Sequence, residues 1–136
     1  MPGTPFHLRA RSVGTPSFFQ AHVGDVEDVK PGMVVVAGAP IDQGIIMSKP
    51  GARLGPRAIR EASVFPRSIW EANPDRTSID VDTLEATRLR APVNILDVGD
   101  FAVDPADIQQ SRRAIAAGVA EIVSRGGLPV VLGGDH

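Results

Sequence analysis

The sequence has no cysteine, no tyrosine and only one tryptophan in its 136 residues. Without cysteine, a disulfide framework, a thiolate metal site and a cysteine nucleophile are all excluded. The absence of cysteine suits a reducing compartment, and we expect the protein in the cytoplasm. No apolar run approaches the length of about 18 residues that a membrane-spanning helix needs, so we expect no membrane partner.

The sequence also lacks an excess of charge of one sign. Its 14 basic and 16 acidic residues give a net charge of −2, and the arginines are scattered among acids rather than clustered. We therefore expect no nucleic-acid partner. The glycine-rich signatures of nucleotide-binding loops and the Gly-x-Ser-x-Gly turn of serine hydrolases are absent as well.

Three short apolar runs predict strands that are buried on both faces, as in a parallel sheet. They cover residues 33–38, 93–98 and 128–132. Because helical patterns separate them, we predict a layered α/β domain. Residues 64–92 remain open, with 78–82 as either a short strand or a loop.

Two helices are predicted between these strands. One opens over residues 55–63, with Pro56 at its first position, where the missing N–H costs nothing. The other is expected to have Asp104 as its cap and Pro105 as its first residue, and to end after Arg125, where Gly126 and Gly127 stop it.

The first 32 residues are rich in proline, glycine and polar side chains, with Phe18 and Phe19 as their only strong apolar anchor. We predict that residues 1–32 form an arm without regular structure, which docks on a neighbouring subunit. Residues 33–136 then form part of one α/β domain.

Polar residues gather in the segments that follow the three predicted strands. In a parallel sheet the carboxyl ends of the strands share one edge, where α/β proteins bind their ligands. The segment 39–54 is long for a loop without a binding role, although its glycines and prolines could serve only to turn the chain. Arg53, Arg57 and Arg60 could hold carboxylates of a ligand or pair with acids nearby. Arg57 and Arg60 share one face of the predicted helix, which could equally be solvated.

Two aspartates and one histidine at strand ends are the candidates for chemistry. Asp97 and Asp100 either cap the next turn or support a metal ligand by hydrogen bonding. His136 follows two glycines that allow close backbone approach, and neutral imidazole is the commonest protein ligand for transition metals. A lone histidine is nevertheless more often not a ligand.

Four segments together resemble the ureohydrolase superfamily of arginases and agmatinases, in order and in spacing. The form of the second segment is similar to the agmatinase branch. The four segments are Gly38-Ala-Pro-Ile-Asp-Gln-Gly44, Pro50-Gly-Ala-Arg-Leu-Gly-Pro-Arg-Ala-Ile-Arg60, Asp97-Val-Gly-Asp100 and Gly133-Gly-Asp-His136.

The resemblance implies a three-layer α/β/α sandwich with a mainly parallel sheet, present here as its N-terminal part. It also implies two Mn²⁺ ions, or Ni²⁺ in some relatives, that bridge a hydroxide. This hydroxide attacks the guanidinium carbon and releases urea and an amine. Metal coordination lowers the pKa of water to about 7 in favourable sites. By position, His136 matches the first metal ligand, and Asp135 would support it.

This chain departs from the superfamily pattern in two ways. The other ligands of the superfamily come from an Asp-Ala-His-x-Asp segment and a Ser-x-Asp-x-Asp segment, and neither is present. Most ligands should therefore lie outside these 136 residues, and the chain alone should be inactive. Ser48 and Lys49 stand where relatives carry Arg or Asn; with Asp42 and Arg53, they are candidates for contact with the substrate.

Two hypotheses remain open. The first is an agmatinase-like hydrolase of a small guanidino substrate, and the second is a non-catalytic subunit or scaffold of the same fold. For either we expect a homo-oligomer, a trimer or hexamer, with a hetero-oligomer containing a paralogous subunit as the alternative.

Overall fold

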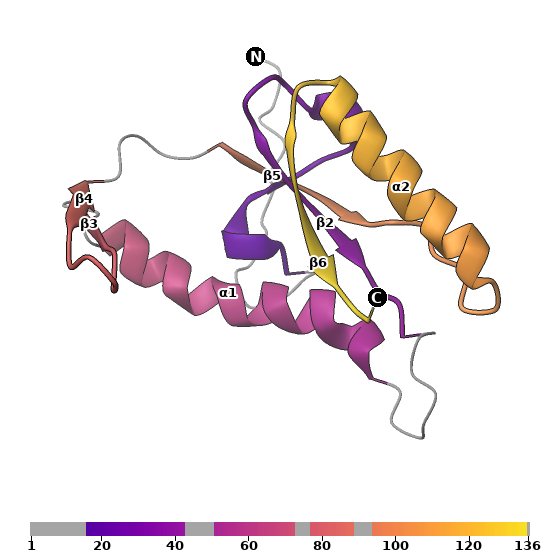
Figure 1. Cartoon of the computed structure of the whole chain (residues 1–136), viewed down its shortest axis with the longest axis horizontal. Coiled ribbons are helices and arrows are strands. Elements are labelled where there is room, and N and C mark those ends of the chain that lie inside the picture. The colour runs from indigo at the N-terminus through magenta and orange to yellow at the C-terminus, as the bar shows by residue number, and fades with distance from the viewer. Residues whose placement is uncertain (1–15, 43–50, 73–76, 89–93, 136) are drawn as a thin grey trace, which may run out of the picture.

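The computed structural model of the chain describes residues 16–42, 51–72, 77–88 and 94–135. Its centre is a four-stranded sheet in the order β1-β5-β2-β6, in which neighbouring strands run parallel (Figure 1). The strands are β1 (His22–Val23), β2 (Val34–Ala39), β5 (Ile95–Asp100) and β6 (Leu128–Gly133). The three strands predicted from apolar runs are confirmed, with ends that shift by at most two residues.

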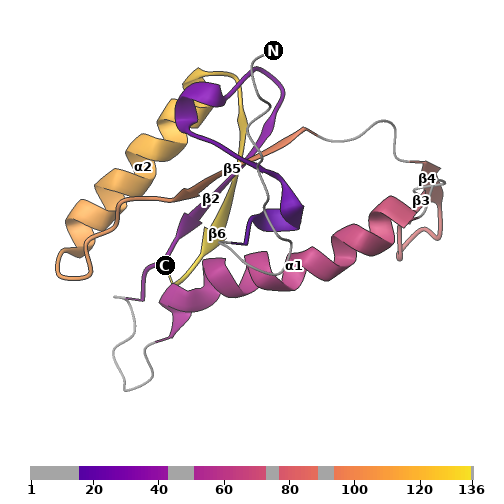
Figure 2. The same ribbon diagram turned by 180° about the vertical axis from the view of Figure 1, so that it is seen from behind.

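Two long helices accompany this sheet. The first, α1 (Gly55–Ala72), follows the short 3₁₀ helix η3 (Ala52–Leu54), and α2 (Ile108–Ser124) connects β5 to β6. A separate antiparallel hairpin, β3 (Thr77–Ile79) and β4 (Ala86–Arg88), lies beyond the end of α1 and away from the sheet (Figure 2). None of the helices in the described ranges is long and apolar enough to cross a bilayer.

The two helices pack on opposite faces of the sheet. Ile122 of α2 belongs to the main apolar cluster with Val35, Ala37 and Leu96, which point to one face. On the other face, Pro56 at the start of α1 is fully buried and lies against Gly38. Because side chains alternate along a strand, these contacts define helix, sheet and helix layers, as predicted.

The predicted start of α2 is wrong by three residues. Asp107 is the cap, and its Oδ1 accepts hydrogen bonds from the backbone N–H groups of Gln109 and Gln110 at 2.8 and 2.9 Å. Asp104 belongs to the preceding turn, where its backbone N–H and C=O both bond to the Ser111 hydroxyl. The hydrogen bonds of the buried Ser111 hold this turn outside the helix. The helix propensities of nearby residues do not reveal this constraint.

The prediction of an arm without regular structure is also wrong for residues 16–32. This segment contains two 3₁₀ helices, η1 (Phe18–Gln20) and η2 (Val26–Asp28), and the edge strand β1. The backbone N–H of Phe19 donates to the Ser63 hydroxyl at 2.7 Å, which fastens η1 to α1 of the same chain. These partners are more than 40 residues away in sequence, so a local pattern could not identify them.

Candidate functional site

The segments that follow β2, β5 and β6 meet at one edge of the sheet, as predicted. The backbone N–H of Phe101 donates to the Gly38 carbonyl at 2.8 Å, and that of Asp135 donates to the Ile41 carbonyl at 2.8 Å. In Figures 1 and 2 the end of β6 lies beside the first turns of α1. The polar motifs at three separate strand ends therefore share one site.

Backbone contacts at this edge leave no room for side chains at two glycines. A Cβ added to Gly134 would lie 2.5 Å from the Ile41 carbonyl oxygen, and one added to Gly55 would lie 2.6 Å from the Gly133 carbonyl oxygen. A backbone atom cannot rotate away as a side-chain end can. The start of α1 and the turn at 133–135 therefore depend on glycine for their close approach.

Arg60, in the second turn of α1, is the centre of a buried ion-pair network. Its Nε and Nη2 donate to the two carboxylate oxygens of Asp97 at 2.8 and 2.9 Å. Its Nη1 donates to Asp100 at 2.6 Å, and Nη2 also reaches the Gly99 carbonyl at 2.8 Å. The fork of the guanidinium thus joins α1 to the end of β5 through charge-assisted bonds.

All four acceptor positions of the Asp97 carboxylate are in use. Besides the two bonds from Arg60, the backbone N–H of Gly99 donates to Oδ1 at 3.0 Å and that of Phe18 donates to Oδ2 at 2.7 Å. A carboxylate offers about four lone-pair sites. Asp97 therefore has no acceptor left for a histidine that binds a metal, and the turn-capping alternative is observed in its bond from Gly99.

A bulge at Gly99 brings Asp100 to the same guanidinium. Regular alternation would place Asp97 and Asp100 on opposite faces of β5. The register between β2 and β5 shifts after Asp97, and Gly99 has a positive φ of 80°, a conformation that favours glycine. Asp100 consequently lies over Gly38, close to the carboxyl end of β2.

The electrostatics of this network favour the charged forms. Burial alone would lower the pKa of Arg60, but hydrogen bonds from its guanidinium to Asp97 and Asp100 outweigh burial and raise it. Arg60 and Asp97 have side chains that are 6% and 2% exposed, whereas the Asp100 side chain is 43% exposed. Removing one partner of such a buried pair is strongly destabilising because the other charge remains without compensation.

A second ion pair joins Asp42 to Arg53. The Nε of Arg53 donates to the Asp42 carboxylate at 2.6 Å, with Asp42 buried and Arg53 half-exposed. This hydrogen bond lowers the pKa of the Asp42 carboxyl, against the effect of burial, and backbone N–H groups of Gly51 and Arg53 lower it further. The same pairing raises the pKa of Arg53.

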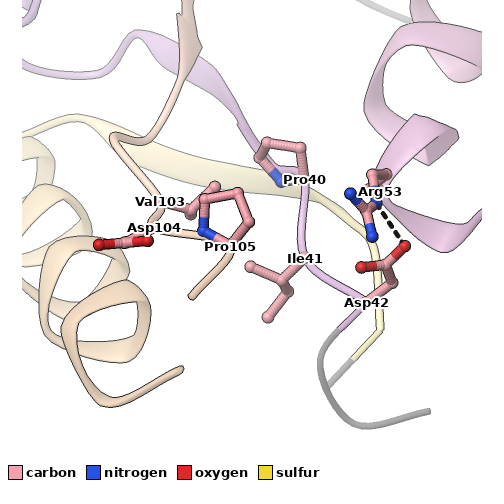
Figure 3. A pocket seen from close by; sticks show the side chains of 7 residues that line it. All are labelled: Pro40, Ile41, Asp42, Arg53, Val103, Asp104 and Pro105. Carbon is pink, nitrogen blue, oxygen red and sulfur yellow. Dashed lines mark hydrogen bonds and ion pairs between the residues drawn. The ribbon is translucent and has the colours of Figure 1, made fainter. Parts of the chain in front are cut away.

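The Asp42–Arg53 pair borders a small, shallow hollow that is partly open to solvent. Pro40 and Ile41 form one wall, and Val103 and Pro105 form the other (Figure 3). In Figure 3 the Asp104 carboxylate lies on the far side of Pro105 from the ion pair. The hollow thus has apolar walls and a paired charge at one end.

Several predicted site residues lie outside the described residues, namely Ser48, Lys49 and His136. Asp135 is described, and its backbone N–H bonds to Ile41.

The described residues do not by themselves fit a two-metal site. No three His, Asp or Glu side chains converge within these ranges. Asp42 and Asp100 are each paired with an arginine, and Asp97 is saturated with hydrogen bonds.

Sequence reasoning did not identify Arg60 as the partner of Asp97 and Asp100. On the predicted helix face, Arg57 and Arg60 were equally good candidates for pairing with an acid. In the structure Arg57 is exposed and pairs with Glu61 at 2.8 Å. A usable signal was present, because a carboxylate inside a strand buried on both faces requires a cationic or hydrogen-bonding partner.

Comparison with known proteins identifies relatives of this chain in sequence and in fold. The sequence model of the arginase family matches residues 33–136. The chain is 36% identical over 99 residues to the mitochondrial guanidino acid hydrolase of Homo sapiens, an alignment that covers 73% of this chain and 24% of that protein. The chain thus spans about a quarter of the length of this relative.

Two solved structures are similar to the fold. A hypothetical agmatinase from Burkholderia thailandensis has a TM-score of 0.65 at 28% identity, over 93% of this chain and 36% of that one. Proclavaminate amidino hydrolase from Streptomyces clavuligerus has a TM-score of 0.64 at 26% identity, over 93% and 38% respectively. Both matches extend over almost the whole of this chain.

Proposed function

Because this chain belongs to the arginase family, we propose that the complete protein hydrolyses a guanidino compound to urea and an amine. In this reaction water adds to the guanidinium carbon, the bond from that carbon to the substituted nitrogen breaks, and the leaving nitrogen takes up a proton. The observation that carries the proposal is the family match over residues 33–136. This range includes the three strand ends with motifs, which the fold brings to one edge of the sheet.

The substrate is a small molecule with a guanidinium at one end. The relatives and structures that resemble this chain are named for guanidino acids, for agmatine and for proclavaminate amidino hydrolysis. These names share a guanidino or amidino group as the part that is acted on, and they differ in the rest of the molecule. We therefore propose the guanidino group as the feature that the protein recognises, with agmatine and 4-guanidinobutyrate as the first compounds to test.

We further propose that hydrolysis depends on Mn²⁺ or Ni²⁺ and that His136 supplies one ligand, with Asp135 beside it. The support is the chemistry of imidazole as a ligand and the position of residue 136 directly after a turn that backbone contacts hold in place. The remaining ligands would have to come from polypeptide other than these 136 residues.

Urea release measures the proposed reaction directly. The complete gene product is incubated with Mn²⁺ or Ni²⁺ and a series of guanidino compounds, and urea is quantified. We expect release from at least one compound and none after removal of metal with a chelator. If no compound in the series yields urea with either metal, a non-catalytic subunit of the same fold becomes the better explanation.

Substitution of His136 tests the ligand. In the complete protein, His136→Ala should lower bound Mn²⁺, measured by elemental analysis, together with urea release. Second-sphere changes alone commonly cost 10- to 100-fold in metal affinity or activity, so loss of a ligand should cost at least about 10-fold. His22→Ala is the matched control, because His22 is an exposed histidine on the short edge strand β1. Equal metal content in both variants would show that His136 is not a metal ligand.

The assembly of the protein stays a prediction. We propose a homo-oligomer, and sedimentation velocity of the complete protein would distinguish a trimer or hexamer from a monomer.

A further inference from the structure

Two arginines of one short segment each hold a different loop at the site edge. Arg53, in η3, pairs with Asp42 on the loop that follows β2, at 2.6 Å. Arg60, in α1, pairs with Asp100 at the end of β5, at 2.6 Å. Asp42 directly follows one wall of the hollow, Pro40 and Ile41, and Asp100 precedes the other, Val103 and Pro105.

The segment that carries both arginines is helical and packs against the ends of two strands. Residues 55–60 are helical, and η3 precedes them without a gap. Gly55 lies in close contact with the Gly133 carbonyl, and Pro56 lies against Gly38. The two guanidinium groups therefore project from one body that is seated on the ends of β2 and β6.

Each loop also forms backbone hydrogen bonds that connect it to neighbouring segments. On the β5 side, Phe101 donates to the Gly38 carbonyl and Val103 donates to the Phe101 carbonyl, both at 2.8 Å. On the β2 side, Ile41 accepts from the backbone N–H of Asp135 at 2.8 Å. A shift of Asp42 would thus move Pro40 and Ile41, which precede it. A shift of Asp100 would move Val103 and Pro105, which follow it.

We propose that Arg53 and Arg60, acting through Asp42 and Asp100, are positioning residues that hold the two walls of this hollow at a fixed separation and so determine how tightly the guanidino substrate binds. This inference rests on the proposed function for its consequence, but the positioning itself is a property of the described residues.

Two substitutions loosen one wall each without removing the most deeply buried charge pair. Arg53→Ala releases Asp42, and its own side chain is half-exposed. Asp100→Ala releases the β5 wall but keeps the pair between Arg60 and Asp97. Arg57→Ala is the matched control, since Arg57 forms an ion pair of similar length with Glu61 on the same helix but does not line the hollow.

The experiment measures kcat and KM of the complete gene product with agmatine and with 4-guanidinobutyrate. A change that weakens substrate binding uniformly raises KM and leaves kcat unchanged. We therefore expect KM to rise at least about 10-fold in Arg53→Ala and Asp100→Ala for whichever compound is hydrolysed, with kcat within about threefold. Arg57→Ala should leave both constants unchanged. A role limited to stability would instead lower the melting temperature and leave KM unchanged well below that temperature.

Amide hydrogen exchange provides a readout that needs no activity. In Asp100→Ala the N–H groups of Phe101 and Val103 should exchange at least about tenfold faster, whereas Arg57→Ala should not change them. If the parent protein releases no urea, the proposed function fails while the exchange data still decide on positioning. Unchanged exchange in Asp100→Ala, or unchanged KM in both test variants of an active protein, would overturn the inference.

Discussion

Neighbouring glycines at the end of β6 have different structural constraints. A Cβ at Gly134 would meet the backbone of Ala39 and Ile41, whereas a Cβ at Gly133 would have nothing within 4 Å. The difference arises because Gly134 lies against the loop after β2, where Asp135 donates its hydrogen bond. The second glycine of the pair, and not the first, brings the two chain segments together.

Substitution by alanine should separate these two positions. Gly134→Ala should lower the free energy of unfolding by about 1–3 kcal/mol, as overpacking against fixed atoms does. Gly133→Ala should change it by no more than about 0.5 kcal/mol, the usual range for a site without contacts. Thermal unfolding followed by circular dichroism measures both. Similar losses in the two variants would contradict the assignment of the close contact to Gly134.

The pairing of acids with arginines is the other feature at this scale. Asp42, Asp97 and Asp100 all lie at the site edge, and each has a guanidinium partner from the segment 53–60. We propose that the protein acts on guanidinium compounds, which could also pair with these carboxylates. Arg53 and Arg60 already pair with all three, so the carboxylates are not available to bind the guanidinium group of the substrate.

At the scale of elements, the start of α2 depends on two aspartates with separate tasks. Asp104 and Ser111 close the turn that leads out of the site, and Asp107 then caps the helix. The cap sits only three residues beyond the turn, so the helix begins close to the wall formed by Val103 and Pro105. The length of the loop between β5 and α2 is set by this double arrangement.

The capping role predicts a specific pattern of stability. Asp107→Ala should lower the free energy of unfolding by about 1 kcal/mol, the usual cost of removing a cap, because two N–H groups lose their acceptor. Asp107→Asn should retain most of the stability, since asparagine caps comparably well. Thermal unfolding of the two variants provides the measurement, and an equal loss in both would indicate that charge rather than capping is responsible.

At the scale of the whole molecule, β6 is an edge strand within the described part of the chain. It pairs with β2 on one side, and Leu128, Val130 and Val131 are substantially exposed. An apolar strand with an unpaired edge is a template for association with another strand. Exposed apolar surface of this kind also marks an interaction site.

We therefore expect the 136-residue chain by itself to associate through β6. Val131→Lys should weaken this association by at least about tenfold, or about 1.4 kcal/mol, because a charge would have to be buried at the new contact. Val81→Lys is the control, as Val81 is an exposed valine between β3 and β4, and this hairpin lies away from β6 (Figure 1). Sedimentation velocity over a range of concentrations would show the difference; a monomer at all concentrations, or equal effects of both lysines, would exclude β6 as the contact.

The sequence by itself determined the strands β2, β5 and β6, the first half of α1, most of α2 and the edge where the motifs meet. These follow from short-range physics, because buried parallel strands need continuous apolar runs and helices need periodic apolar positions, caps and terminal glycines. The starting residue of α2 was missed because two aspartates within four residues compete for the cap, and the choice depends on the tertiary bond of Ser111.

Only the tertiary structure decided which charge pairs with which. Arg60 meets acids that are 37 and 40 residues away, and it meets both only because a bulge at Gly99 turns Asp100 to the side of Asp97. Likewise, the N-terminal segment joins the sheet through bonds to β5 that span more than 70 residues. Strand order, register and bulges set these distances, and local preferences of the chain carry no information about them.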